Sequence, residues 1–246
     1  MQSAIVTGAS AGIGLECAKI LLKNNYQVFG GARRVEKMQQ ALQHDNFHPL
    51  SLDICNEDSI DQFLNAVKAK SPNINTLINN AGIALGVDPI HQGNPQDWQK
   101  VIDTNVMGLL RFTRKVLPIF VQQNGGDVIN IGSIAGHFSY AGGGVYAGTK
   151  HMVKAINQAM RLELNGTKIR VCSVSPGLVE TEFSVVRLGS QEKADQVYKD
   201  MEPLTPQDIA ECVEFCLNRP KHVNIDDIII MPTHQASVYK VHRKTN

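Results

Sequence analysis

The sequence has few of the residues on which disulfide scaffolds and metal sites depend. Its 246 residues include five cysteines, an odd number, and no Cys-x-x-Cys pair, so no disulfide framework is predicted. Cys212 and Cys216 share a predicted helix face, where packing is the expected role and a redox role stays open. The eight histidines are dispersed without a His-Glu-x-x-His pattern, and we therefore predict no metal. Reduced, packed thiols are typical of a cytoplasmic protein.

Neither sign of charge is in excess, because 24 basic residues face 23 acidic ones. A net charge of +1 offers no general attraction for nucleic acid or for an anionic membrane surface. The chain also lacks an apolar run near the ~18 residues of a membrane span, and no charged-then-apolar leader precedes its first strand. We expect a soluble cytoplasmic protein with a small-molecule substrate and with no nucleic-acid or membrane partner.

Short β-rich runs alternate with longer amphipathic segments along the chain. Strands are predicted at 4–6, 27–30, 48–52, 76–79, 127–131, 169–173 and 227–231. Helices are predicted at 12–24, 36–43, 57–70, 95–123, 145–164 and 206–217. Because each strand-helix-strand unit requires a parallel crossover, the predicted fold is α/β, a doubly wound Rossmann-type parallel seven-stranded sheet with helices on both faces. No repeat or linker divides the chain, so 1–246 is predicted to be one catalytic domain.

The least regular segment is 176–204, which follows the sixth predicted strand and contains a short predicted helix around 191–201. Ligands of doubly wound sheets bind beyond the carboxyl ends of the strands. A long insertion at this position is therefore a candidate substrate lid.

A glycine-rich turn, residues 7–14, lies between the first strand and the first helix. Gly8, Gly12 and Gly14 would let the backbone approach a pyrophosphate, and the following helix would direct free N–H groups at it. A purely structural turn is the alternative, although the position between strand and helix favours dinucleotide binding.

The end of the second strand distinguishes between the two nicotinamide dinucleotides. An acidic side chain there would accept hydrogen bonds from a ribose hydroxyl, but this chain has Arg33 and Arg34, and Glu36 comes too late. Two guanidinium groups suit a ribose phosphate, so the cofactor is predicted to be NADP. Solvated surface arginines are the alternative.

Tyr146 and Lys150 are four residues apart, with Ser133 thirteen residues upstream. Residues at i and i+4 share a helix face, so the Lys150 ammonium is expected beside the Tyr146 phenol, where it would favour the ionised form. Tyr146 is then a candidate for proton transfer, and Ser133 can hydrogen-bond the substrate oxygen. A core tyrosine and a strand-end serine cap are the alternatives for each residue taken alone.

Further motifs occur in a fixed order over nearly the whole chain. They are Thr-Gly-x-x-x-Gly-Ile-Gly at 7–14, Asn-Asn-Ala-Gly at 79–82, Asn105, Ser133, Tyr146-x-x-x-Lys150 and Pro-Gly at 176–177. This set resembles the classical short-chain dehydrogenase/reductase family. The segments 32–34, 140–143, 176–179, 181–184, 222–225 and 231–232 resemble its NADP-dependent 3-hydroxy-acid/serine dehydrogenase branch.

The resemblance implies a catalytic set of Asn105, Ser133, Tyr146 and Lys150, with Asn105 holding a water relay beneath Lys150, and a homotetramer. A helix-interior amide is the alternative for Asn105, and a strand-end helix cap for Asp53. With the residues deduced above, the expected cofactor contacts are Thr7, Gly8, Ser10, Ala11, Gly12, Ile13, Gly14, Arg33, Arg34, Asp53, Ile54, Asn80, Ala81, Gly82, Tyr146, Lys150, Pro176, Gly177, Val179 and Thr181.

One departure from the family is Ala11, which stands where many NADP-preferring relatives have a basic residue. The phosphate would then depend more on Arg33 and Arg34, together with Ser10.

The substrate is expected to be a secondary alcohol or its carbonyl, and the branch resemblance implies a small 3-hydroxy acid such as serine or allo-threonine. Its carboxylate needs a cation, and Arg187 in the irregular segment is the candidate beside Ser133 and Tyr146, with an exposed arginine as the alternative. Lys240, His242 and Arg243 form a basic tail. This tail either closes over a neighbouring site or is a disordered end of the chain. Reduction of neutral ketones or aldehydes, and NADP(H) sensing without catalysis, remain open.

Overall fold

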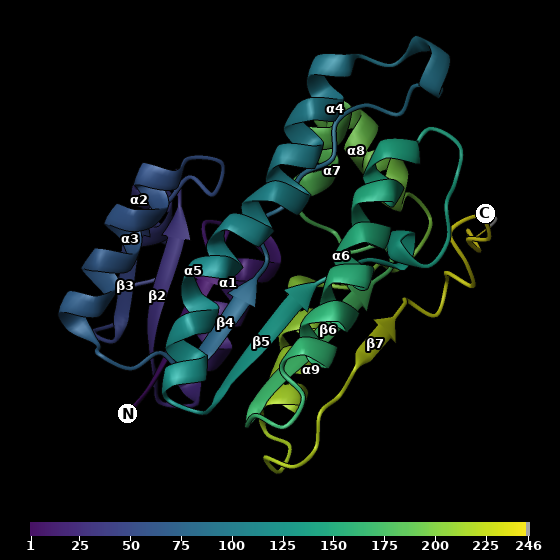
Figure 1. Ribbon diagram of the computed structural model, residues 1–246. Helices are drawn as coiled ribbons and strands as arrows, with labels where there is room; N and C mark the ends of the chain where they lie inside the picture. Colours follow the sequence, from purple (N-terminus) through teal and green to yellow (C-terminus); the bar gives the residue numbers. More distant parts are fainter. Residues whose placement is uncertain (245–246) are drawn as a thin grey trace.

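A parallel sheet of seven strands runs through the molecule in the order β3-β2-β1-β4-β5-β6-β7, with helices against both faces (Figure 1). The computed structural model describes residues 1–244, so the last two residues of the predicted domain lie outside the described residues. Strands β1 to β3 are added in one direction across the sheet and β4 to β7 in the other, so the strand order reverses between β1 and β4 and opens a crevice beyond the carboxyl ends of the strands. The predicted fold is confirmed. The strands are β1 (Gln2–Thr7), β2 (Tyr26–Ala32), β3 (Phe47–Ser51), β4 (Thr76–Asn79), β5 (Gly126–Ile131), β6 (Ile169–Pro176) and β7 (Asp227–Ile230).

Alternating strand residues supply the two layers of the core. Ala4 and Val6 of β1 pack on one face, while Ile5 between them packs on the other. The first face is covered by α1 (Gly12–Lys23), α2 (Val35–Ala41) and α9 (Pro206–Leu217). The second is covered by α3 (Glu57–Lys70), α5 (Leu109–Gln122) and α6 (Gly144–Glu163). Both faces are thus apolar, which is typical of a doubly wound sheet.

The helix predicted over 95–123 is interrupted in the structure. It consists of α4 (Pro95–Ile102), a π-helical segment η2 (Asp103–Gly108) and then α5. A continuous helix was therefore the wrong prediction, because helical periodicity does not reveal a local change from i+4 to i+5 hydrogen bonding. Such segments are frequent at functional sites, and this one contains Asn105.

The irregular segment 176–204 holds two short helices, of which only the second was predicted. These are α7 (Glu182–Leu188) and α8 (Gln191–Tyr198). The Thr181 hydroxyl accepts a hydrogen bond from the Phe183 amide at the start of α7, and Gly189 ends the helix in the left-handed conformation. Helix α7 was not predicted because its seven residues are too few to show a helical period and its two adjacent valines have a low helix propensity.

A buried ion pair lies at the opposite end of the strands from the crevice. Arg170 near the start of β6 donates to Asp127 near the start of β5, with 2.5 Å between Nε and Oδ1. The same guanidinium donates to the backbone oxygens of Leu217, Arg219 and Val223. Arg170 thus joins two strands to the carboxyl end of α9, where helix carbonyl groups need donors.

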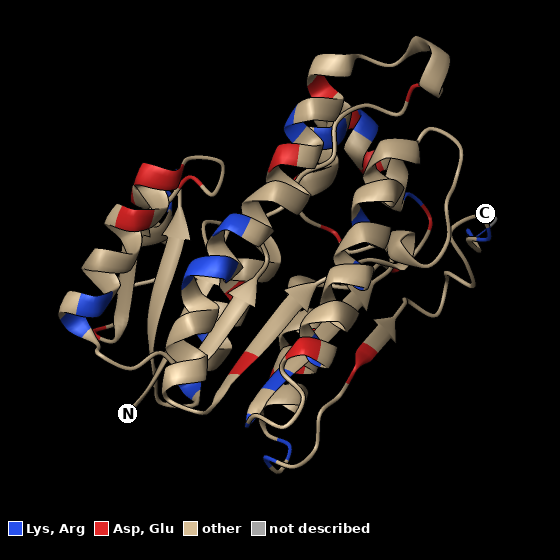
Figure 2. Cartoon of the chain, viewed as in Figure 1, with Lys and Arg blue, Asp and Glu red and all other residues tan. Residues whose placement is uncertain are grey.

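Basic and acidic residues are interspersed along the helices in the view of Figure 2. None of the helices in the described part of the chain combines the length and the apolar character that crossing a membrane would need. The remaining short helical turns are η1 (Ile90–Gln92) and η3 (Ile134–Gly136).

Candidate active site

A cleft of about 910 Å³ lies at the carboxyl ends of the strands. Its lining runs from the glycine-rich turn and the Arg33-Arg34 pair, past the end of β4, to Ser133, Tyr146 and Arg187. The volume falls in the range of small-molecule and cofactor sites. Most of the residues predicted from the sequence therefore meet in one cleft, although they are far apart along the chain.

The glycine-rich turn is held against the end of β4 by side-chain hydrogen bonds. The Thr7 hydroxyl accepts from the Asn80 and Ala81 amides at 3.0 and 3.1 Å, and the Asn80 side-chain amide donates to the Thr7 and Gly8 oxygens. Gly8 and Gly12 have φ values of +70° and +54°, which L side chains rarely adopt. A Cβ on Gly14 would collide with the Asn80 amide and the Gly8 oxygen. The turn therefore presents bare backbone to the cleft, as a pyrophosphate requires.

Arg34 reaches back from the end of β2 to the glycine-rich turn. Its Nη2 donates to the Ser10 hydroxyl at 3.2 Å, and both of its Nη atoms donate to the Glu182 carboxylate. Arg33 is exposed and also lines the cleft. The residues beside the turn thus supply the forked donors expected for a ribose phosphate.

Asp53 and Ile54 follow β3 and line the same end of the cleft. The Asp53 carboxylate accepts from the Cys55 amide, whereas the cap of α3 is Asn56, which accepts from the Ser59 amide. The alternative role of Asp53 as a helix cap is therefore wrong.

The turn that carries Ser133 packs tightly on α6. Ser133 caps η3 by accepting from the Ala135 amide, and a Cβ on Gly136 would come within 2.7 Å of the Lys150 backbone oxygen. The Lys150 ammonium donates to the Ile131 oxygen at 2.8 Å, and its Nζ lies 5.9 Å from the centroid of the Tyr146 ring. Ser133, Tyr146 and Lys150 are thereby fixed relative to one another.

Burial dominates the acid–base properties of this pair. It raises the pKa of Tyr146 to about 12, an effect that the Ser133 hydroxyl opposes, Tyr140 increases and Arg187 opposes. It also lowers the pKa of Lys150 to about 8. The effect of the Lys150 ammonium on the phenol therefore stays a prediction: in the protein alone burial is the largest influence on Tyr146, and the ammonium donates to the Ile131 oxygen.

The buried lysine makes stability depend on pH. Unfolded, Lys150 keeps its proton up to about pH 10.4, whereas its folded pKa is about 8. Between these values the unfolded state binds more protons, so the free energy of unfolding rises with pH. We expect Lys150→Met to be more stable than the wild type at pH 7 by about 2 kcal/mol, after the lost hydrogen bond is counted.

Urea unfolding of both proteins between pH 7 and pH 10 checks this expectation. The advantage of Lys150→Met should shrink above about pH 8, because the folded wild-type lysine is then neutral and the cost of removing its proton on folding falls as the pH approaches 10. Lys168→Met at an exposed position is the control. An advantage that stays constant over this range would mean that burial does not disfavour the charged lysine.

Asn105 is buried under the loop that follows β4. Its side-chain amide exchanges two hydrogen bonds of 2.8 Å with the backbone of Ile83 and donates to the Thr149 hydroxyl at 3.1 Å. The Thr149 hydroxyl in turn donates to the backbone carbonyl oxygen of Tyr146. A Cβ on Gly82 would lie 3.3 Å from Asn105 Oδ1 and 3.8 Å from Lys150 Nζ. Asn105 thus joins the cleft wall to α6 close to Lys150.

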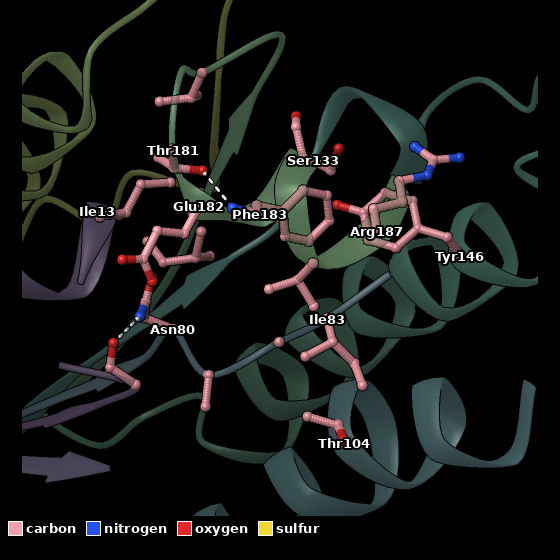
Figure 3. A pocket seen from close by; sticks show the side chains of 18 of the residues that line it. Ile13, Asn80, Ile83, Thr104, Ser133, Tyr146, Thr181, Glu182, Phe183 and Arg187 are labelled. Carbon is pink, nitrogen blue, oxygen red and sulfur yellow. Dashed lines mark hydrogen bonds between the residues drawn. The ribbon is translucent and has the colours of Figure 1, made fainter. Parts of the chain in front are cut away.

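Arg187 and Phe183 of α7 lie over the Tyr146 ring (Figure 3). The Phe183 ring centroid is 5.5 Å from that of Tyr146, and Arg187 Cζ is 5.7 Å from it. Arg187 also donates to the Tyr140 hydroxyl at 2.8 Å and to the Gly142 oxygen at 3.4 Å. The structure therefore places this arginine beside the phenol, where a substrate carboxylate would need it.

The segment from Pro176 to Thr181 forms the opposite wall. Gln235 holds it from the carboxyl-terminal part of the chain by accepting from the Leu178 amide at 2.8 Å, and Tyr198 donates to the Val179 oxygen at 2.7 Å. Both contacts join residues that are distant along the chain, and no sequence motif signalled them.

The basic tail lies against its own chain. Arg243 donates to the Val197 oxygen at 3.1 Å and to the Lys199 oxygen, and the His242 amide donates to the His234 oxygen at 2.7 Å. The alternative of a disordered end is therefore wrong for the described part of the tail.

Three predicted site residues lie behind the cleft wall, because Thr7, Gly14 and Asn105 are absent from its lining. Thr7 and Asn105 are buried and bonded to the wall, while Gly14 provides room for Asn80. Their observed contacts position the residues that face the cleft. Thr149, Phe183 and Gln235 were missed by the sequence prediction.

The cleft thus joins a backbone cradle suited to a dinucleotide to a buried phenol suited to proton transfer. The fold and this combination define a dinucleotide-binding oxidoreductase. Ala11, Gly12 and Ile13 line the cradle, and a Cβ on Gly12 would lie 3.2 Å from the Thr181 side chain across it. The two walls therefore meet at this point of the cleft, and a side chain at position 12 would press on Thr181.

Comparison with known proteins agrees with this class. The chain belongs to the short chain dehydrogenase family, whose model matches residues 2–191. A relative from Schizosaccharomyces pombe, an NADP-dependent 3-hydroxy acid dehydrogenase, is 43% identical over 99% of this chain and 97% of its own. A serine 3-dehydrogenase from Agrobacterium fabrum is 38% identical over 98% of both chains.

A solved structure of similar shape is the closed form of a serine dehydrogenase complexed with NADP+. It has a TM-score of 0.94 and 40% identity, over 99% of this chain and 100% of its own. The predicted resemblance is therefore confirmed at the level of both the family and its hydroxy-acid branch.

Proposed function

We propose that this protein is an NADP-dependent oxidoreductase acting on CH–OH groups, with a small 3-hydroxy acid such as serine or allo-threonine as substrate. The observation that carries the proposal is the position of Arg187, 5.7 Å from the Tyr146 ring in a cleft that also contains the glycine-rich turn and Arg34. The relatives that use NADP and act on hydroxy acids support both cofactor and substrate.

Ser133 and Tyr146 face the substrate oxygen in this proposal. When bound, the nicotinamide would supply the carbon that accepts or gives a hydride. The Ser133 hydroxyl would hold the substrate oxygen, and the Tyr146 phenol would exchange a proton with it. With its pKa raised to about 12, Tyr146 is neutral near pH 7, which is the form that donates a proton to a carbonyl oxygen.

Lys150 and Asn105 would serve proton return in this proposal. Lys150 Nζ and Asn105 Oδ1 both lie close to Gly82, and the lysine pKa of about 8 allows it to give up a proton near neutral pH. This arrangement supports the expected relay beneath Lys150.

The proposed contacts with the cofactor follow the cleft wall. The pyrophosphate would bind the turn at Gly8, Ser10, Ala11, Gly12 and Ile13, the adenosine would lie near Asp53 and Ile54, and the ribose phosphate would bind Arg33 and Arg34. The nicotinamide half would pass Asn80, Ala81 and Gly82 toward Tyr146, Lys150, Pro176, Gly177, Val179 and Thr181. All of these residues line the cleft.

Removal of the Arg34 guanidinium is expected to weaken NADP specifically. Arg34→Leu should raise the Kd for NADPH by about tenfold or more, since a charge-assisted forked contact is lost. The Kd for NADH should stay within about twofold. Titration of reduced-nicotinamide fluorescence measures both, with exposed Arg114→Leu outside the cleft as control. Equal weakening of the two cofactors would contradict a phosphate role.

The substrate class is tested by steady-state turnover of serine, allo-threonine and short 3-hydroxy acids against matched neutral alcohols and ketones. Arg187→Met should raise KM for the acids about tenfold or more and change KM for the neutral compounds much less. Equal effects would remove Arg187 from the carboxylate site. Turnover of neutral compounds alone would favour a reductase of neutral ketones or aldehydes over a hydroxy-acid dehydrogenase. Tight NADP binding without any turnover would favour a protein that senses NADP(H) without catalysis.

We further propose a single catalytic domain over 1–246, with 176–204 as a substrate lid, in a cytoplasmic homotetramer. The contacts of Phe183 and Arg187 with Tyr146 support the lid. Exposed apolar side chains at Ile102, Met107 and Leu110, on consecutive elements, support association between copies. Light scattering after gel filtration measures the oligomer number.

A further inference from the structure

Three charged side chains form a cluster at the adenosine end of the cleft. Both Nη atoms of Arg34 donate to Oε2 of Glu182 at 3.1 Å, and the Lys37 ammonium pairs with Oε1 of the same carboxylate. Arg34 and Lys37 come from the start of α2, whereas Glu182 is the first residue of α7. The cluster therefore ties the irregular segment to the cofactor end of the sheet.

The cluster is open to solvent, with 56% of the Arg34 side chain and 47% of the Glu182 side chain exposed. The Lys37 ammonium and the Arg34 guanidinium hold the pKa of Glu182 below its ordinary value, so the carboxylate is ionised near neutral pH. Exposed ion pairs are weak individually. A stronger anion at the same place would therefore displace Glu182 readily.

A ribose phosphate is such an anion. A phosphate monoester carries a charge of about −1.5 to −2 at pH 7 and three acceptor oxygens, more than one carboxylate offers. Both Nη atoms of Arg34 already donate to a single Glu182 oxygen. The guanidinium therefore cannot give the same pair of hydrogen bonds to Glu182 and to a phosphate at once. A phosphate beside an unmoved Glu182 would also meet a like charge.

We propose that Glu182 takes the place of the cofactor's ribose phosphate in the free protein, that NADP displaces it, and that Lys37 then joins Arg34 as a cation for the phosphate. This inference rests on the proposed function, because it requires NADP to bind at Arg33 and Arg34. It assigns Lys37 and Glu182 as determinants of cofactor choice.

Helix α7 extends the effect of this exchange to the other end of the cleft. Glu182 points toward the side of Ile13 and Asn80, whereas Arg187, five residues later, lies beside Tyr146 (Figure 3). Loss of the Glu182 contacts frees the start of the helix that carries Arg187. The exchange at Glu182 therefore reaches the helix that carries Arg187, so a difference in KM for the acid between NADP and NAD measures the coupling of the two ends.

The test uses Glu182→Gln, which removes the charge and keeps the shape, and Lys37→Met. Kd values for NADPH and NADH are measured by nicotinamide fluorescence at about 20 mM and about 1 M salt, where charges are weakly and strongly screened. Glu180→Gln is the matched control, since it removes an exposed carboxylate two residues away that makes no ion pair within residues 1–244.

At low salt, Glu182→Gln should bind NADPH about three- to tenfold more tightly, and Lys37→Met should bind it more weakly by a similar factor. NADH binding should change less than about twofold, and the differences should fade at high salt. In Glu182→Gln the two cofactors should also give the same KM for the acid.

The outcomes separate this inference from the proposed function. A wild-type protein that binds NADPH no better than NADH overturns both. A wild-type preference for NADPH, with Glu182→Gln unchanged or weaker in NADPH binding, overturns the inference alone, because Glu182 would then be inert or a support for Arg34. Lys37→Met with unchanged NADPH affinity removes Lys37 from the phosphate site.

Discussion

Tyr146→Phe is expected to lower kcat by about 10³-fold or more, while Kd for NADPH stays within about threefold. The substitution removes the hydroxyl that exchanges the proton and keeps the ring that packs against Phe183 at 5.5 Å. With its pKa raised to about 12, the wild-type phenol keeps its proton near pH 7, whereas the phenyl ring of the variant has no proton to donate. Initial rates of NADP-linked turnover, measured beside NADPH fluorescence titration, separate chemistry from binding.

The matched control is Tyr140→Phe. Tyr140 also lines the cleft, and its hydroxyl accepts from Arg187 at 2.8 Å, but the proposed reaction gives it no proton to transfer. We expect its loss to act mainly on KM for acids, through Arg187, with kcat reduced less than about tenfold. Near-normal kcat in Tyr146→Phe, or equal losses in the two variants, would refute proton transfer by Tyr146.

Among the substitutions proposed here, Arg170→Leu is expected to lower the free energy of unfolding the most. The side chain is only 7% exposed, and it donates hydrogen bonds to Asp127 and to three backbone oxygens at once. Its removal leaves a buried carboxylate and helix-end carbonyl groups without a main donor, at a cost of about 3–5 kcal/mol. For a chain of this size the melting temperature should fall on the order of 10 °C.

Lys221→Leu provides the comparison, since Lys221 contacts the other oxygen of the same Asp127 at 3.0 Å. Its side chain is 64% exposed, so the expected loss is below about 1 kcal/mol. Urea unfolding of both variants at pH 7 measures the difference. Equal losses would show that burial does not determine the contribution of these two cations.

The fold could be predicted from the sequence because its determinants are local or periodic. Buried strands read as short apolar runs, and α3 and α9 begin and end where their caps and the apolar pattern indicate. The prediction failed where hydrogen-bond geometry changes within an apparently regular helix, as at η2, and where a helix is too short to show a period, as at α7.

The site was predictable where the chemistry is contained in a short motif. The turn at 7–14 and the spacing of Tyr146 and Lys150 place backbone and side chains together by local geometry. In contrast, Lys37 meets Glu182 across 145 positions, and Gln235 meets Leu178 across 57. Such contacts depend on how α2, α7 and the carboxyl-terminal segment pack, which no local pattern determines.

The two ends of the sheet also differ in what a substitution there would change. Asp127 and Arg170 lie at the amino ends of β5 and β6, whereas the cleft opens at the carboxyl ends. Side chains of the 176–204 segment can therefore be exchanged for others without contact with the buried ion pair at the opposite end. Substitutions that change the alcohol substrate would be tolerated at the carboxyl edge of the sheet, whereas substitutions at the amino edge would destabilise the fold. Related proteins can therefore differ in substrate and still share one backbone.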